Sequence, residues 1–154
     1  MILKDQISFP KPIIVPENLK SKLVVKTNCE ISEHEVTLFN ISIKATAKYI
    51  EDHHIDLSNY LTLNVYFTYN NQISISQEKE SILGCQFCVA TYQMEGLRKK
   101  PDGVILFVFI EELAHHFLRI IDERIIKQKV EEIYKYIVPD FTLKRYLEAY
   151  YNDW

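Results

Sequence analysis

The alternation of apolar and polar residues predicts a strand over residues 61–69, LTLNVYFTY. Leucine, valine and phenylalanine occupy every second position there, which places them together on one face of a strand. Residues 73–76 alternate in the same way, and residues 82–92 predict a further strand, although a helix also fits that stretch. Residues 23–26 (LVVK) form either a short strand or the lead into the first helix. The chain therefore carries the strands of a small sheet.

A helix is expected over residues 32–53. Its apolar residues recur at three- and four-residue spacing and also at two-residue spacing, so both a helix and a strand fit the pattern. The length of the stretch, without glycine or proline, favours the helix. Ser32 is the expected N-cap, and Glu35 three residues later completes a capping box.

Further helices are expected in the C-terminal part of the chain. No glycine or proline occurs between Gly103 and Pro139, and one helix of that length is unusual in a small domain. A break near Asp122 divides the stretch into two helices, because aspartate caps the start of a helix. A last helix is expected after Pro139, with leucine and tyrosine side chains on its buried face.

These elements predict an α+β fold in a single domain, residues 1–154. We expect a small, mostly antiparallel sheet packed against helices, with a central buried helix that begins near residue 104. Three prolines within residues 1–20 predict an extended N-terminal arm, because proline removes a backbone donor and fixes φ. The hydrophobic content of 47% is sufficient for one core.

Composition and charge exclude several classes of function. With 18 basic and 21 acidic residues, the chain has no basic excess, so we expect no nucleic-acid partner. The longest apolar run, VILFVFI, spans only residues 104–110, whereas a membrane helix needs about 20 residues. A signal peptide is not evident, and three cysteines are typical of a reducing compartment, so the expected location is cytoplasmic. With three glycines, the chain contains none of the glycine-rich nucleotide-binding motifs.

The candidate chemistry lies in FIEELAHHF, residues 109–117. On a helix, residues four apart lie one above the other, so Glu111 lies over His115 and Glu112 over His116. The surrounding residues are apolar, which indicates a helix that runs through the core. Removing a carboxylate from water costs several kcal/mol, so these groups require partners, a metal ion or a cleft.

The run EELAHH after an apolar lead-in resembles the HExxH helix of zincin metallopeptidases, with Glu111 in place of the first histidine. The resemblance is specific over residues 104–116, and the coarse order of helix, strands and further helices is also similar. It implies a zincin-like fold with Glu111 and His115 as metal ligands and Glu112 as the general base. It also implies a metal-polarised water that attacks a carbonyl.

The resemblance also implies a third ligand on the following helix, as in a gluzincin-like arrangement. Glu123 and Glu131 are the candidates, and Asp122 is a weaker one. Zinc accepts carboxylate oxygen as well as imidazole nitrogen, so Glu111 can still ligate it. The additional anionic ligand makes zinc a poorer Lewis acid and favours a harder cation, such as manganese.

Two functions follow from this pattern. The first is a zincin-like metallopeptidase-related protein, a hydrolase with altered or lost catalysis that acts on a protein or peptide. The second is a non-catalytic protein-interaction module that retains the fold without a metal. In that case the charged residues, including His116, would pair with one another and with Arg119 or Arg124. A di-iron site would need two Glu-x-x-His helices, and the strand-like stretch between Glu51 and Glu112 argues against it.

Two other groups are weaker candidates. Cys85 and Cys88 form a single CxxC, which is explained by core packing or by a mixed zinc site with His115 or His116. The basic cluster at residues 98–100 is small enough to be an ordinary solvated loop.

Overall fold

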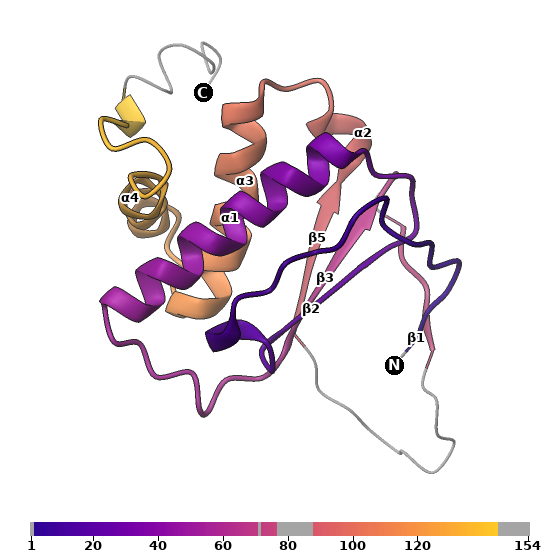
Figure 1. Ribbon diagram of the computed structural model, residues 1–154, viewed down its shortest axis with the longest axis horizontal. Coiled ribbons are helices and arrows are strands. Elements are labelled where there is room, and N and C mark those ends of the chain that lie inside the picture. The colour runs from indigo at the N-terminus through magenta and orange to yellow at the C-terminus, as the bar shows by residue number, and fades with distance from the viewer. Residues whose placement is uncertain (1, 71, 77–87, 145–154) are drawn as a thin grey trace.

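The computed structural model describes residues 2–70, 72–76 and 88–144, and its centre is a parallel sheet with helices on one side (Figure 1). The strand order is β2 (Leu23–Thr27), β3 (Leu63–Thr68) and β5 (Cys88–Gln93). Both neighbouring pairs run parallel, with Leu63 opposite Leu23 and Cys88. The helix α1 (Glu33–Asp52) connects β2 to β3 and so forms a βαβ unit.

The prediction of a mostly antiparallel sheet is therefore wrong. Antiparallel pairing in the described residues is confined to a two-residue ladder between β1 (Ile2–Leu3) and β4 (Ile75–Ser76) and a bridge from Ile7 to Thr27. The alternation in residues 61–69 correctly indicated a strand, but it carries no information on the direction of the neighbouring strands. That direction depends on the segments that connect the strands. A helix between two adjacent strands brings the chain back to the same end of the sheet, so the second strand runs parallel to the first.

The strand β3 is buried on both faces, as central strands of parallel sheets generally are. Val65 and Phe67 face the helices, with 0% and 1% exposure, and Tyr66 on the opposite face is also fully buried. An aromatic cluster joins the layers: the ring centroid of Phe67 lies 4.9 Å from that of Phe39 on α1 and 5.3 Å from that of Tyr92 on β5. These contacts hold the sheet against the helices.

The predicted capping box at the start of α1 is confirmed. The Ser32 hydroxyl oxygen accepts a hydrogen bond from the Glu35 backbone N–H at 3.2 Å, and a Glu35 carboxylate oxygen accepts one from the Ser32 N–H at 2.7 Å. Arg98, which follows the short helix α2 (Met94–Leu97), donates to the other Glu35 oxygen at 2.7 Å and also to the Glu30 carbonyl. The basic cluster is thus more than a solvated loop, because Arg98 links two distant segments.

The predicted break near Asp122 is also confirmed. The helix α3 (Asp102–Leu118) ends at Arg119, whose φ of 53° and ψ of 38° are left-handed. The helix α4 (Glu123–Tyr134) then begins with Asp122 as its N-cap, which accepts hydrogen bonds from two backbone N–H groups at 2.9 and 3.2 Å. Most apolar residues of α3 are buried, so the expected central buried helix is present.

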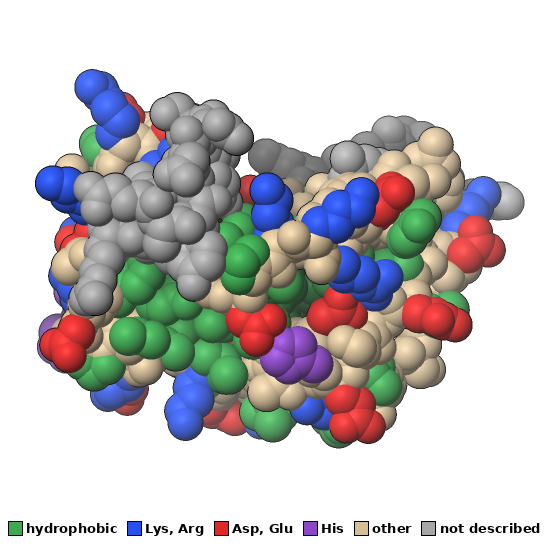
Figure 2. Space-filling model, turned by 90° about the horizontal axis from the view of Figure 1, so that it is seen from above, with side chains coloured by type: hydrophobic (Ala, Val, Ile, Leu, Met, Phe, Trp, Pro, Cys, Tyr) green, Lys and Arg blue, Asp and Glu red, His purple; other side chains and the backbone are tan. Residues whose placement is uncertain are grey.

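Several expected features fall partly outside the described residues. This is true of residues 82–87, which contain Cys85, and of most of the helix expected after Pro139. Apart from β1 and the bridge at Ile7, the described N-terminal segment up to residue 16 is irregular, and the short 3-10 helix η1 (Glu17–Leu19) follows it. Among the described helices, none has the length and apolar character needed to cross a bilayer. Figure 2 shows one face on which hydrophobic side chains gather, with acidic and basic side chains dispersed around them.

Candidate metal centre

The four ionisable residues of FIEELAHHF lie half-buried along one side of α3. The residues between and beside them, including Leu113, Ala114 and Phe117, are fully buried against the rest of the core. The helix is therefore buried on most of its surface, but its charged side chains lie where water reaches them. The free-energy cost of removing these side chains from water is therefore smaller than the cost of burying them completely in the core.

Three of the predicted ligands converge. One ligand atom each from Glu111, His115 and Glu123 lies within 4.8 Å of the others, and this group could hold a metal ion. Glu111 and His115 lie one helical turn apart on α3, while Glu123 is the first residue of α4. The left-handed Arg119 and the cap at Asp122 reverse the chain between the two helices. This turn brings Glu123 to the end of α3.

The hydrogen bonding of His115 prepares its imidazole to be a ligand. Its Nδ1 lies 2.6 Å from the carbonyl oxygen of Ile120. Because a carbonyl only accepts, Nδ1 carries a proton, and in the neutral imidazole Nε2 then has the lone pair. That Nε2 lies 3.7 Å from a carboxylate oxygen of Glu123. Metal-binding histidines commonly donate their second ring nitrogen to a carbonyl in this way, which fixes the ring orientation.

The distance between two of the ligand atoms is close to the spacing found around a small metal ion. Ligand atoms about 2.0–2.1 Å from a tetrahedral zinc lie roughly 3.3 Å apart. The distance of 3.7 Å between His115 Nε2 and Glu123 Oε1 is close to that value. The Glu123 side chain is 67% exposed, so it can close the remaining gap by changing rotamer.

The electrostatics of the group favour a cation. Burial raises the pKa of Glu111, and the negative charges of Glu123 and Glu112 raise it further, against the attraction of Lys127. Burial is also the main reason that the pKa of Glu112 is raised; His115 lowers this pKa and Glu123 raises it. Glu112 therefore lies within electrostatic reach of the group. A bound cation would relieve the repulsion between these carboxylates.

The other predicted ligands have different partners. Glu131 pairs with Lys135 at 3.0 Å and accepts a hydrogen bond from the Leu143 N–H at 3.2 Å, so the structure does not bring it to the group. Asp122 is occupied as the cap of α4. The Nε2 of His116 lies 3.0 Å from the Leu61 carbonyl, which assigns the proton to that nitrogen.

The expected arginine partners do not neutralise the carboxylates. Arg124 pairs with Asp122 at 3.6 Å, and the Arg119 guanidinium lies 4.0 Å from the centre of the Tyr60 ring. Within the part of the chain that the structure describes, no ion pair joins an arginine to Glu111 or Glu112. Ion pairs with arginine therefore do not account for the two half-buried carboxylates, Glu111 and Glu112.

A cavity of about 440 Å³ lies beside the group, and His115 lines it. Its other lining residues come from the segment before β3, the start of β5 and the end of α3: Asn59, Tyr60, Leu61, Cys88, His116, Arg119 and Ile121. Sequence reasoning did not place Tyr60 or Arg119 in a cavity. No local pattern relates them, because they lie on segments far apart in the chain.

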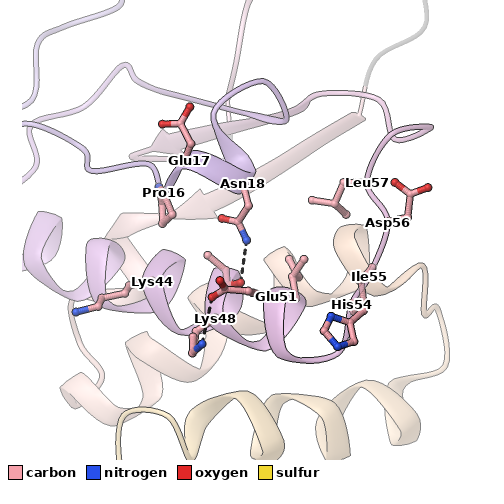
Figure 3. A pocket seen from close by; sticks show the side chains of 12 residues that line it. Pro16, Glu17, Asn18, Lys44, Lys48, Glu51, His54, Ile55, Asp56 and Leu57 are labelled. Atoms are coloured by element: carbon pink, nitrogen blue, oxygen red, sulfur yellow. Dashed lines mark hydrogen bonds and ion pairs between the residues drawn. The ribbon is translucent and has the colours of Figure 1, made fainter.

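A second cavity of about 770 Å³ lies between η1, the C-terminal half of α1 and the loop that follows it (Figure 3). Glu51 and His54 line it, and Glu51 is paired with Lys48 at 3.1 Å. Glu51 and His54 therefore line a different cavity from the one that His115 lines. This arrangement gives no support to a di-iron site.

Comparison with known proteins provides no further assignment. No family model matches the chain, and neither the curated proteins nor the solved structures contain a match.

Proposed function

We propose that this protein binds a divalent transition-metal ion through Glu111, His115 and Glu123, and that it is related to metal-dependent peptidases. Zinc is the first expected ion and manganese the second. The convergence of three ligand atoms within 4.8 Å carries the proposal. The hydrogen bond that holds the Nδ1 proton of His115 supports it, because this bond leaves Nε2 free to ligate.

Glu112 is the proposed general base. A bound metal ion supplies Lewis acidity, which polarises a water molecule and a carbonyl. The electrostatic interaction of Glu112 with His115 and Glu123 supports this role, because it indicates that the carboxylate lies near the proposed metal ligands. Burial raises its pKa toward neutrality, which improves its ability to return the proton to a leaving group.

The ligand set predicts altered catalysis. Two carboxylates place two negative charges around the metal ion, whereas histidine ligands are neutral. The metal is then a weaker Lewis acid, and the ligand oxygens favour harder cations more than imidazole nitrogens do. We therefore propose hydrolysis of peptides that is slower than a site with two histidines would support, with relatively better function in manganese.

Isothermal titration with zinc chloride and manganese chloride tests the metal site. We expect one equivalent to bind, and the Glu111→Gln, His115→Gln and Glu123→Gln substitutions each to weaken binding by at least ~10-fold, since each removes a ligand. Glu131→Gln is the matched control, because it removes a carboxylate of α4 outside the group and should bind as the wild type does. Absence of stoichiometric binding to the wild-type protein would overturn the proposal.

Hydrolysis is tested separately with a mixed peptide library, analysed by mass spectrometry. The metal-loaded wild type should cleave it, and Glu112→Gln should retain the metal but lose cleavage. If metal binds and no peptide is cleaved, the catalytic part of the proposal is wrong. The protein would then be a metal-binding module without peptidase activity.

A further inference from the structure

The 440 Å³ cavity beside the candidate metal ligands has one permanently charged side chain in its wall, that of Arg119. Its other lining residues carry no full positive charge apart from any protonated histidine, and several are apolar or aromatic: Tyr60, Leu61 and Ile121. The cavity therefore combines a single permanently cationic group with a wall of mixed polar and apolar side chains. This combination is typical of sites that hold a small organic anion.

The guanidinium of Arg119 is held in place by neutral partners. It lies 4.0 Å from the centre of the Tyr60 ring, and its Nη2 donates to the Asn59 carbonyl at 3.2 Å. Among the described residues, no carboxylate forms an ion pair with it. An arginine has five N–H donors, and within the described part of the chain one of them is used, so the described contacts orient the group and leave four donors unoccupied. Planar oxyanions accept two parallel hydrogen bonds from such a fork.

The backbone at Arg119 supports a functional role for its side chain. The residue has φ 53° and ψ 38°, a conformation in which glycine is usual after a helix. Placing a residue with a side chain there costs about 1 kcal/mol. Asp5 and His54 are the other described non-glycine residues with a positive φ, and Arg119 is the one among the three that lines this cavity. Strained residues of this kind cluster at functional sites.

His115 connects the cavity to the metal ligands. Its ring lines the cavity, and its Nε2 lies 3.7 Å from the Glu123 carboxylate within the candidate metal centre. An anion bound at Arg119 would therefore share the cavity with His115, one of the three candidate metal ligands. The cavity volume is sufficient for a ligand of about the size of a substituted benzene ring.

From these observations we propose that the cavity binds a small organic anion, a carboxylate or a phosphate ester, through Arg119. Arg119 would be a positioning and specificity-determining residue that places an anionic end of the substrate next to the metal. The role in catalysis rests on the proposed metal-dependent function, whereas binding of the anion does not require the metal. A terminal carboxylate is the form that a peptide substrate would offer.

The test uses the full chain, both metal-free and zinc-loaded, with sodium benzoate and phenyl phosphate as probes and benzyl alcohol as the neutral control. Binding is followed by two-dimensional amide NMR and by calorimetry. We expect one or both anions to shift the signals of residues 59–61 and 115–119, and benzyl alcohol to leave them unchanged. The anion that binds more tightly identifies carboxylate or phosphate as the preferred group.

Two variants identify the binding residue. Arg119→Asn removes the guanidinium but keeps a residue that tolerates the left-handed conformation, and it should weaken anion binding by at least ~10-fold. Arg124→Asn is the control, since Arg124 is 92% exposed on α4 and outside the cavity, and it should bind the anions as the wild type does. Equal anion binding by wild type and Arg119→Asn, or no binding by wild type, would overturn the inference.

Zinc titration of the same samples separates this inference from the proposed function. Arg119→Asn should bind zinc as the wild type does, which also shows that its fold is intact. If the wild-type protein binds the anions but does not bind zinc, the proposed metal site is wrong and the inference about the anion stands. Zinc binding without any anion binding would contradict the inference alone.

Discussion

The contact between Arg98 and Glu35 should contribute strongly to stability, because it neutralises a buried carboxylate. The Glu35 side chain is only 7% exposed, whereas that of Arg98 is 36% exposed. Arg98→Met keeps most of the aliphatic stem and removes the charge. It leaves the Glu35 carboxylate with hydrogen bonds from Ser32 alone, including the one from the Ser32 N–H at 2.7 Å.

The expected loss is about 2–3 kcal/mol in the free energy of unfolding. Breaking a fully buried ion pair costs about 3–5 kcal/mol, and exposure of the arginine to water reduces that value. Urea unfolding followed by circular dichroism measures the change. Lys99→Met is the matched control, because Lys99 is the exposed neighbour, and its effect should stay within about 0.5 kcal/mol.

A double-mutant cycle with Glu35→Gln isolates the interaction. If the two groups stabilise each other, the double variant should lose at least about 1 kcal/mol less than the sum of the single losses. A coupling energy near zero would refute the reasoning, even if each single variant is destabilised. The individual losses would then come from packing and from the capping box.

The pH dependence gives an independent check on the same pair. Burial tends to raise the pKa of Glu35, but the hydrogen bonds from Arg98 and Ser32 outweigh it, so the pKa lies below the ordinary 4.5. A lowered pKa in the folded state means that the stabilisation is present above pH 4.5 and is lost as the pH falls through the folded-state pKa. The wild type should therefore lose stability over this acidic range, and Arg98→Met should lose less.

Three further predictions concern the core and the candidate site. Tyr92→Phe removes a fully buried hydroxyl that donates to the Phe109 carbonyl at 2.8 Å, and urea unfolding should show a loss of about 1 kcal/mol; an unchanged midpoint would contradict this. Arg119→Gly should be more stable than Arg119→Ala by about 1 kcal/mol, because only glycine adopts the left-handed conformation without strain; equal stabilities would contradict the strain. Zinc affinity should decrease as the pH falls, and the decrease should begin above the ordinary carboxyl pKa of 4.5. The pKa of Glu111 is raised, so protons compete with the metal for this carboxylate at a higher pH than they would for an ordinary one. Calorimetry across pH 5–7 measures the affinity, and a constant value would contradict the prediction.

Local signals predicted the helix starts correctly. Ser32 and Glu35 are three residues apart, and the hydrogen bonds of a capping box involve only that segment. Asp122 likewise caps α4 with its own side chain and the next backbone N–H groups. Such features depend on a few neighbouring residues, so they can be recognised without the tertiary structure.

The sheet and the arginine contacts depended on long-range packing. The alternation over residues 61–69 shows which side chains share a face, and it is the same for parallel and antiparallel neighbours. Arg98 and Glu35 are 63 residues apart, and Arg119 reaches a carbonyl 60 residues away. No spacing rule relates residues at such separations, so the parallel sheet, the stabilising ion pair and the cavity were not predicted.

The candidate site combines both kinds of information. By itself the sequence determined that Glu111 and His115 share one side of a helix, because the helical repeat places residues four apart in register. It left Glu123 and Glu131 as equal candidates for the third ligand. Only the tertiary structure distinguishes their positions, because the left-handed turn at Arg119 directs the start of α4, and with it Glu123, back to His115. Glu131 lies two turns further along α4 and pairs with Lys135.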